Sequence, residues 1–277
     1  MEWWWAYLLI GVTVGFLAGL FGIGIAVGFL AGLFGVGGGM VMVPMLVFVF
    51  TAKGFPAEHM MHLSLATSMA TIVFTSLSSV RAHHRHDAVD WAVARAMAPG
   101  IVVGALTATL IAGFIPTRPL AIAFTGFMFY AATRMFIEVK PRPSRELPGA
   151  AGLFGVGAGI GALSSVLAAG GAFLSIPFLA RCNVPIKRAI GTAAANGFPI
   201  AAAGTAGYVL NGLRVDGLPE GSLGFVYLPA LAIIVLASMP TAPLGAWLAH
   251  RLAVRRLRIV FALMLLAIAL RMLANLW

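Results

Sequence analysis

The chain has little charge and almost no cysteine. Of its 277 residues only 9% are charged whereas 61% are hydrophobic, and the mean hydropathy is +1.01. A soluble domain needs roughly a quarter of its residues charged to cover its surface, so this composition excludes a protein that faces water on all sides. Cys182 is the single cysteine, which excludes an internal disulfide and a cysteine-based metal site.

Acidic residues are scarce, and none falls inside an expected spanning helix. The eight acids, all in expected loops or at span ends, are Glu2, Glu58, Asp87, Asp90, Glu138, Glu146, Asp216 and Glu220. Their positions exclude a carboxylate proton relay and the paired acids of an intramembrane hydrolase. We therefore expect no enzyme and no cofactor. No Lys or Arg precedes Lys53, so we expect a retained first helix anchored by its tryptophans rather than a cleaved signal peptide.

Apolar stretches recur along the chain, and many reach the 18 residues typical of a membrane-spanning helix. Charged residues divide them into the expected helices 4–34, 41–51, 58–80, 91–113, 120–138, 149–168, 172–180, 186–209, 225–249 and 259–276. We predict an all-α polytopic membrane protein of the bacterial inner membrane. The formal net charge of +10 comes from Lys and Arg in short loops, as the positive-inside rule requires, and indicates no nucleic-acid partner.

Two expected helices, 41–51 and 172–180, are too short to cross a bilayer. Each follows a glycine break and contains a proline, and "LFGVGGGMVMVPML" (33–46) aligns with "VLAAGGAFLSIPFL" (166–179) at a constant offset of 133. The residue pairs matched here and further along the chain include Gly37 and Gly170, Gly38 and Gly171, Pro44 and Pro177, Thr67 and Thr192, and Arg134 and Arg271. The chain therefore has two homologous halves.

The halves are 1–139 and 149–277, and a basic linker, 140–148, joins them. Internal halves with broken helices at matching positions are typical of secondary transporters. If each broken pair enters and leaves on one side, the basic loops and the linker all face the cytoplasm and both termini face outside. The first half then starts outside and the second inside. We predict two inverted-topology repeats, each with a glycine-broken helix pair plus three spanning helices.

The stretch before the first break contains a nearly exact sequence repeat. GFLAGLFG begins at Gly15 and again at Gly28, 13 positions later. The first half is longer before its break than the second half by close to one such unit, so we interpret one copy as a tandem insertion. Thirteen residues advance a helix by about 220° after whole turns, so the two copies cannot share one face. The insertion is expected to lengthen, tilt or kink the first helix.

The pattern G-x-G-G-G-x-x-x-V-P, formed by Gly35, Gly37, Gly38, Gly39, Val43 and Pro44, resembles the sulfite exporter TauE/SafE family of bacterial inner-membrane permeases. The likeness covers most of both halves, with a degenerate second copy in which Gly170, Gly171 and Ala172 replace the three glycines. The resemblance implies transport of sulfur-containing anions such as sulfite, sulfoacetate, related organosulfonates and sometimes thiosulfate. It marks the family better than the substrate.

The glycine breaks are the first candidate binding site. Glycines leave backbone N–H groups open at the start of the following helix, and a helix N-terminus binds anions. We therefore expect Gly37, Gly38, Gly39, Gly170 and Gly171 to contact substrate. The alternative is that these glycines only let helices pack closely, as small residues do in membranes.

Polar side chains within the spans are the second set of candidates. Neutral donors suit a sulfonate, and those chosen as substrate-binding are Thr67, Ser68, Thr192 and Asn196; back-bonding to their own helix is the alternative. Arg134 and Arg271 are the basic residues expected well within spans, and intramembrane charge is usually functional. Pairing of Arg134 with Glu138 and snorkelling of Arg271 are the alternatives.

The loop "RAHHRHD" (81–87) carries three histidines and an aspartate, but a solvated basic loop is favoured over a metal site because no second ligand cluster accompanies it. The sequence therefore favours a secondary carrier that exports a small sulfur-containing anion by alternating access. An ion-coupled importer of sulfonates or thiosulfate and a channel-like anion pore remain as alternatives. The expected partners are the anion and the lipid bilayer, and a homo-oligomer is left open.

Overall fold

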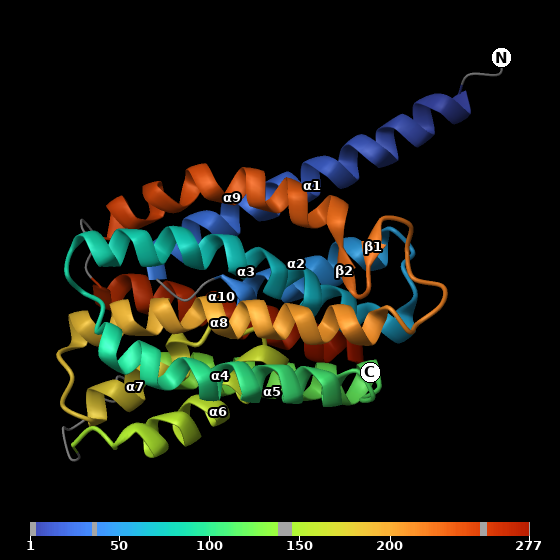
Figure 1. Ribbon diagram of the computed structural model, residues 1–277. Coiled ribbons are helices and arrows are strands. Elements are labelled where there is room, and N and C mark those ends of the chain that lie inside the picture. The colour runs from blue at the N-terminus through green and yellow to red at the C-terminus, as the bar shows by residue number, and fades with distance from the viewer. Residues whose placement is uncertain (1–3, 35–37, 138–145, 250–253, 277) are drawn as a thin grey trace.

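The computed structural model describes residues 4–34, 38–137, 146–249 and 254–276, and within these the side chains of 15–30, 38–137, 146–241, 244 and 259–274. The described chain is a bundle of ten α-helices with one short β-hairpin at one end (Figure 1). The linker expected at 140–148, and Gly37, lie wholly or mostly outside the described residues.

The first half contains five helices and one 3₁₀ turn. They are α1 (Trp4–Phe34), α2 (Gly39–Ala52), η1 (Ala57–His59), α3 (Met60–Arg85), α4 (Trp91–Ala112) and α5 (Thr117–Phe136). The second half follows the same order with a hairpin added before its fourth helix. Its elements are α6 (Ala150–Val166), α7 (Ala172–Arg181), α8 (Ile186–Gly212), β1 (Ser222–Leu223), β2 (Val226–Tyr227), α9 (Leu228–Ala249) and α10 (Val254–Leu276).

The helix ends gather at two faces of the bundle. The α3–α4 and α7–α8 connections, with Arg85, Arg181 and Lys187 among their basic residues, lie at the left end in Figure 1. The start of α1, the β-hairpin and the end of α10 lie at the right end. This separation of basic loops from both chain ends is the arrangement expected from the loop charges.

The first broken pair is a helical hairpin. A Cβ on Gly19 in α1 would contact Val49 in α2, and the Lys53 Nζ atom lies 4.4 Å from the Phe16 ring centroid. Residues near the middle of α1 therefore face the last residues of α2, so the two helices are antiparallel and α2 returns toward the end at which α1 entered. Figure 1 likewise places the start of α6 and the end of α7 at one end of the bundle.

The duplicated segment lies in a single continuous helix of 31 residues, α1. Its N-terminal part projects beyond the rest of the bundle in Figure 1. A Cβ on Gly28 would collide with Ser238 and Thr241 of α9, whereas the corresponding Gly15 has open space. The helix that holds both copies has 31 residues, against 17 in the matched helix α6, which agrees with the expected lengthening. Of the two glycines, only Gly28 packs against α9.

Small residues bring two helix pairs into close contact. A Cβ on Gly100 of α4 would meet the Phe154 carbonyl of α6, and one on Gly104 would meet the Ala158 carbonyl. The helices α4 and α6 are therefore parallel. In α1, Gly24 meets Ile234 of α9 and Gly28 meets Ser238, so α1 and α9 are parallel as well. Such backbone contact through glycine is typical of helix pairs in membranes.

The helices α3 and α8 pack against each other in the centre of the bundle. Ser76 lies beside Gly197 and Met69 beside Gly204, so the two helices are antiparallel. The contact of Asn196 with Met97, and a hydrogen bond of 2.8 Å from the Asn211 amide to the Thr109 carbonyl, make α8 parallel to α4.

Several boundaries differ from the predicted helices, and those of α9 and α3 show why. Residues 225–227 were expected in a spanning helix, but Val226 and Tyr227 form β2, which pairs with β1 in an antiparallel register. The local pattern is apolar in both cases, so it cannot distinguish a buried strand from the start of a helix. The helix α3 also continues to Arg85 rather than ending near residue 80, because Arg and Ala are good helix formers.

By length and hydropathy alone, two described segments are suited to crossing a membrane: Ala57–Arg85 and Trp91–Ala112. Shorter apolar stretches occur at Gly15–Leu30, Gly39–Ala52, Ala150–Val166, Ala172–Arg181, Leu228–Thr241 and Ile259–Ala274. Large apolar side chains also cover the outer surface, including Leu236 at 71% exposure and Val260 at 64%. An outer surface of this kind fits lipid rather than water.

Candidate substrate site between two glycine breaks

The first break ends in a left-handed glycine. Gly38 has φ +70° and is the N-cap of α2, with no side chain capping the helix. Its carbonyl accepts hydrogen bonds from the N–H groups of Val41 and Met42. Only glycine adopts this conformation without cost, and the helix that begins here presents its positive end toward the centre of the bundle.

The second break repeats this geometry at the aligned position. Gly170 has φ +64° and Gly171, which aligns with Gly38, has φ +74°. Gly171 is the N-cap of α7, and its carbonyl accepts a hydrogen bond of 2.8 Å from the Ser175 N–H. Ala168 also adopts positive φ, +45°, which is unusual for a residue with a side chain. The prediction of a second broken helix, with its N-terminus at the matched glycine, is confirmed.

The two breaks contact each other. A Cβ on Gly39 would collide with the carbonyl oxygen of Ala168, and it would lie 2.9 Å from the Ile72 Cδ1 atom of α3. A Cβ on Gly171 would collide with Ile200 of α8. The N-termini of α2 and α7 therefore both reach the region where α3 packs against α8.

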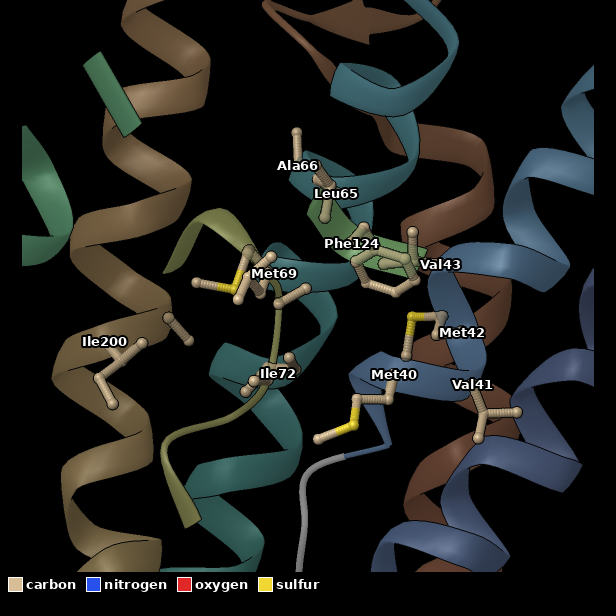
Figure 2. Close-up of a cluster of buried hydrophobic side chains, with 14 of the residues drawn as sticks. Met40, Val41, Met42, Val43, Leu65, Ala66, Met69, Ile72, Phe124 and Ile200 are labelled. Atoms are coloured by element: carbon tan, nitrogen blue, oxygen red, sulfur yellow. The ribbon is translucent and has the colours of Figure 1, made fainter. Parts of the chain in front are cut away.

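Apolar side chains fill this region. Figure 2 shows Met69 and Ile72 of α3 between Ile200 of α8 and Met40 of α2, and all four are at most 1% exposed. The first break is thus covered by carbon and sulfur rather than by water-accessible polar groups. Among the described residues, these four side chains are therefore shielded from solvent.

Two of the four predicted polar residues are buried with atoms that lack a hydrogen-bond partner. Ser68 is 0% exposed and its hydroxyl has none. Asn196 is 1% exposed; its Nδ2 atom lies 3.6 Å from the Met97 sulfur, and its Oδ1 atom has no partner. Buried polar atoms without partners are uncommon in folded proteins, so these two side chains are available to a ligand.

The other two predicted hydroxyls bind backbone. The Thr67 hydroxyl oxygen accepts from the Tyr227 N–H at 3.1 Å, and the Thr192 hydroxyl oxygen accepts from the Asp90 N–H at 2.9 Å. Both hydroxyls are buried and both bonds join opposite halves of the chain. Their recurrence at aligned positions therefore has a structural explanation. Each hydroxyl retains its own proton, so a contact with substrate stays a prediction.

The two arginines differ in their surroundings. Arg271 is exposed, and its guanidinium carbon lies 5.0 Å from the ring centroid of Phe48, itself 57% exposed. Arg134 is half-buried in the last turn of α5, and its expected partner Glu138 lies outside the described residues. The structure therefore does not bring Arg271 to the breaks, while Arg134 is the more enclosed of the two.

The histidine-containing segment 81–87, expected as a loop, mostly forms the last turn of α3, where His84 contacts Trp91. The Trp91 Nε1–H donates to the His84 Nδ1 atom at 3.3 Å, and the two rings are in edge contact. In the described part of the chain, no three His, Cys, Asp or Glu side chains cluster closely enough to hold a metal ion.

Two of the buried polar side chains that the sequence reasoning missed, His62 and Tyr208, are large. His62 is 3% exposed; its Nε2–H donates to the Ala112 carbonyl at 3.1 Å, and its Nδ1 atom has no partner. Tyr208 is fully buried and its hydroxyl has no partner either. His62 lies near the expected start of a span, where solvent exposure is the usual outcome. Tyr208 lies in a helix rich in alanine and glycine, and its large side chain among small residues could have indicated that it is buried.

The glycine breaks and the packed halves can be compared with known proteins. The family described as "Sulfite exporter TauE/SafE" matches residues 22–272, which include both breaks. The chain belongs to this family. The region that matches the TauE/SafE family includes nearly the whole bundle, so the similarity extends over both halves and is not limited to one motif.

Relatives of this TauE/SafE-family chain carry transporter names. A probable membrane transporter protein of Haemophilus influenzae is 35% identical over 267 residues, 96% of each chain. A probable membrane transporter protein of Methanocaldococcus jannaschii is 24% identical over 92% of this chain and 90% of the relative. No solved structure matches the chain. Together with the apolar helices, these relatives establish a membrane transporter family and favour transport over catalysis.

Proposed function

We propose that this protein is a secondary transporter that exports a small sulfur-containing anion across the bacterial inner membrane by alternating access. Sulfite, sulfoacetate and related organosulfonates are the substrates that membership of the TauE/SafE family favours. The observation that carries the proposal is the contact between Gly39 and Ala168. Two helix N-termini meet there in the centre of a membrane bundle, as at the substrate sites of other secondary transporters.

The proposed architecture is a multi-pass bundle of two inverted-topology repeats. The helix directions support it: α6 is parallel to α4, which is parallel to α8, whereas α1 is parallel to α9. Because a short hairpin joins α8 to α9 at one end of the bundle, these two helices run in opposite directions. The first helix of one half therefore opposes the first helix of the other.

The chemistry of the site suits an anion that must be released again. Each helix N-terminus carries about half a positive charge and free N–H groups. Ser68 adds a hydroxyl donor that has no other partner, and Asn196 adds its Nδ2 amide donor, whose contact with the Met97 sulfur at 3.6 Å uses at most one of its two hydrogens. A sulfonate held by neutral donors and helix dipoles is bound without the full desolvation cost of a buried ion pair.

A binding screen tests the proposal most directly. Purified protein is heated with sulfite, sulfoacetate, taurine or thiosulfate, with chloride as the control anion. Ligand at a hundred times its Kd stabilises the folded state by about 2.7 kcal/mol, so a substrate raises the melting temperature by several degrees. Stabilisation by none of the three anions, sulfite, sulfoacetate and thiosulfate, contradicts the proposed substrate class.

Flux measurements separate the carrier from its alternatives. Efflux of the stabilising anion from proteoliposomes saturates with concentration for a carrier and stays linear for a channel-like pore. Uptake that follows a proton or sodium gradient identifies an ion-coupled importer instead. The same preparation with the chain omitted gives the background leak.

A further inference from the structure

The β1–β2 hairpin of the second half docks onto the first half. The Tyr227 N–H donates to the Thr67 hydroxyl oxygen at 3.1 Å. The Tyr227 ring contacts three aromatic rings of the first half, with centroid distances of 6.4 Å to Phe16, 5.6 Å to Phe50 and 5.0 Å to Phe55. We call the Thr67–Tyr227 hydrogen bond the outer latch, because the hairpin lies at the end of the bundle opposite the basic loops (Figure 1).

A second aromatic contact strengthens the docking of the hairpin. Phe225 is 1% exposed and stacks on the His62 ring of α3, with a centroid distance of 4.9 Å and an interplanar angle of 28°. Its neighbour Gly224 packs on the backbone of Val209 in α8. The hairpin thus bridges α3 and α8 and covers the outer end of their interface.

At the opposite end, the α3–α4 loop of the first half docks onto α8 of the second. The Asp90 N–H donates to the Thr192 hydroxyl oxygen at 2.9 Å, a bond we call the inner latch. The Ala88 carbonyl fills the space that a side chain at Gly191 would need. Asp90 also caps α4, since its Oδ1 atom accepts from the N–H groups of Ala92 and Val93.

The two latches are equivalent in the alignment of the halves. Thr67 aligns with Thr192, and each hydroxyl accepts from the residue that immediately precedes a helix of the other half: Tyr227 before α9 and Asp90 before α4. The two bonds hold opposite ends of the same α3–α8 interface. Thr67 therefore binds the second half near the start of α3, and Thr192 binds the first half near the start of α8.

We propose that the two latches are the extracytoplasmic and cytoplasmic gates of the transport path, both closed in this conformation, and that each open state releases one of them. This inference rests on the proposed function, because alternating access needs a barrier at each end. The buried, apolar centre formed by Met40, Met69, Ile72 and Ile200 lies between the two barriers and fits a closed state. Loss of one latch should then open one end and leave the other closed.

Thiol labelling tests the inference without a known substrate. Ile72→Cys, introduced with Cys182→Ala, places a single thiol at a position that is 1% exposed, in the apolar centre between the latches. A membrane-impermeant maleimide is applied separately from each side in oriented vesicles. A buried hydrogen bond shifts a two-state equilibrium by up to about tenfold. Thr67→Val should therefore raise the labelling rate several-fold from the extracytoplasmic side only, and Thr192→Val from the cytoplasmic side only.

Matched variants keep the test decisive. Thr125→Val removes a buried hydroxyl of α5 that makes no hydrogen bond, and should leave both labelling rates unchanged. Thr67→Ser and Thr192→Ser keep the hydroxyl and should restore the parent rates. If the valine variants fail to fold, Thr67→Ala and Thr192→Ala replace them. Each alanine variant should then show the side-specific increase in labelling, and the serine variant at the same position should not.

The outcomes separate the gates from the proposed function. Equal rates in all variants, or the same change from both sides, overturns the gates even if a sulfur anion binds and is exported. Side-specific labelling in a protein that binds none of the tested anions supports the gates and overturns the proposed substrate class.

Discussion

The carbonyl oxygen of Ala168 occupies the position that a β-carbon on Gly39 would need. This contact joins the two halves at their glycine breaks, and Gly39 makes it as a residue within α2 rather than as a left-handed glycine. Its requirement for glycine is therefore steric. The lack of space beside Gly39, and not a need for left-handed backbone, excludes a side chain at this position.

Gly39→Ala should destabilise the protein by about 1–3 kcal/mol, the usual cost of overpacking a buried contact. The measurement is the melting temperature of purified protein in detergent. Gly126→Ala is the matched control, because Gly126 is also helical and has open space around it. A Gly39→Ala protein as stable as the parent would show that the two breaks separate at no cost.

Gly38→Leu should abolish transport while leaving the protein inserted, because a side chain there fills the space where an anion meets the α2 N-terminus. Left-handed backbone costs a non-glycine residue roughly 1–2 kcal/mol, so strain must be separated from obstruction. Gly54→Leu is the control: Gly54 has φ +76° in open space outside the helices. Substrate-induced stabilisation and efflux are measured for both, and equal losses would assign the effect to strain.

Ser68→Ala should weaken anion binding roughly tenfold or more without lowering the stability of the substrate-free protein. A hydrogen bond to a charged group contributes about 1.5–3 kcal/mol, whereas removing an unpartnered buried hydroxyl costs little. The anion concentration needed for half-maximal thermal stabilisation gives the affinity. Thr125→Val should change neither quantity, and an unchanged affinity in Ser68→Ala would exclude this hydroxyl from the site.

Arg271→Gln should leave anion affinity unchanged, because Arg271 is exposed and lies over Phe48, a contact worth about 0.5–1 kcal/mol at exposed sites. Arg134→Gln, at the half-buried matched position, should weaken affinity about tenfold if its charge reaches the anion. Isothermal titration of both variants checks the difference. Equal effects would contradict the asymmetry between the two arginines.

Export of a monoanion should be electrogenic and uncoupled. A cytoplasm-negative membrane drives each negative charge outward with about 2.3 kcal/mol per 100 mV, roughly a fiftyfold gradient, since 1.4 kcal/mol is a factor of ten. No acid lies within the described central helices α3 and α8, where a proton-coupling carboxylate would be expected. Efflux is measured with the potential clamped by potassium and valinomycin. Efflux that is independent of the potential but increases with a proton or sodium gradient would contradict this mechanism.

Composition and spacing alone determined a great deal about this protein. The lack of charge and the apolar runs indicated membrane helices, and the offset between glycine-rich segments predicted that Gly171 begins a helix as Gly38 does. These inferences succeed because they depend on local properties: transfer of apolar side chains out of water, and the left-handed backbone that only glycine adopts freely. The extra length of α1 followed from the duplication for the same reason.

Only the tertiary structure decided what the polar side chains do. Thr67 and Ser68 are adjacent and equally buried, yet the first accepts a backbone N–H from the other half and the second has no partner. A helix turns about 100° between neighbours, so their surroundings depend on which helices pack on each face. The same holds for Arg134 and Arg271, which match in sequence and differ in burial. Contacts between residues that are distant along the chain, such as Tyr227 with Thr67 and Ala168 with Gly39, form only when the two halves pack together.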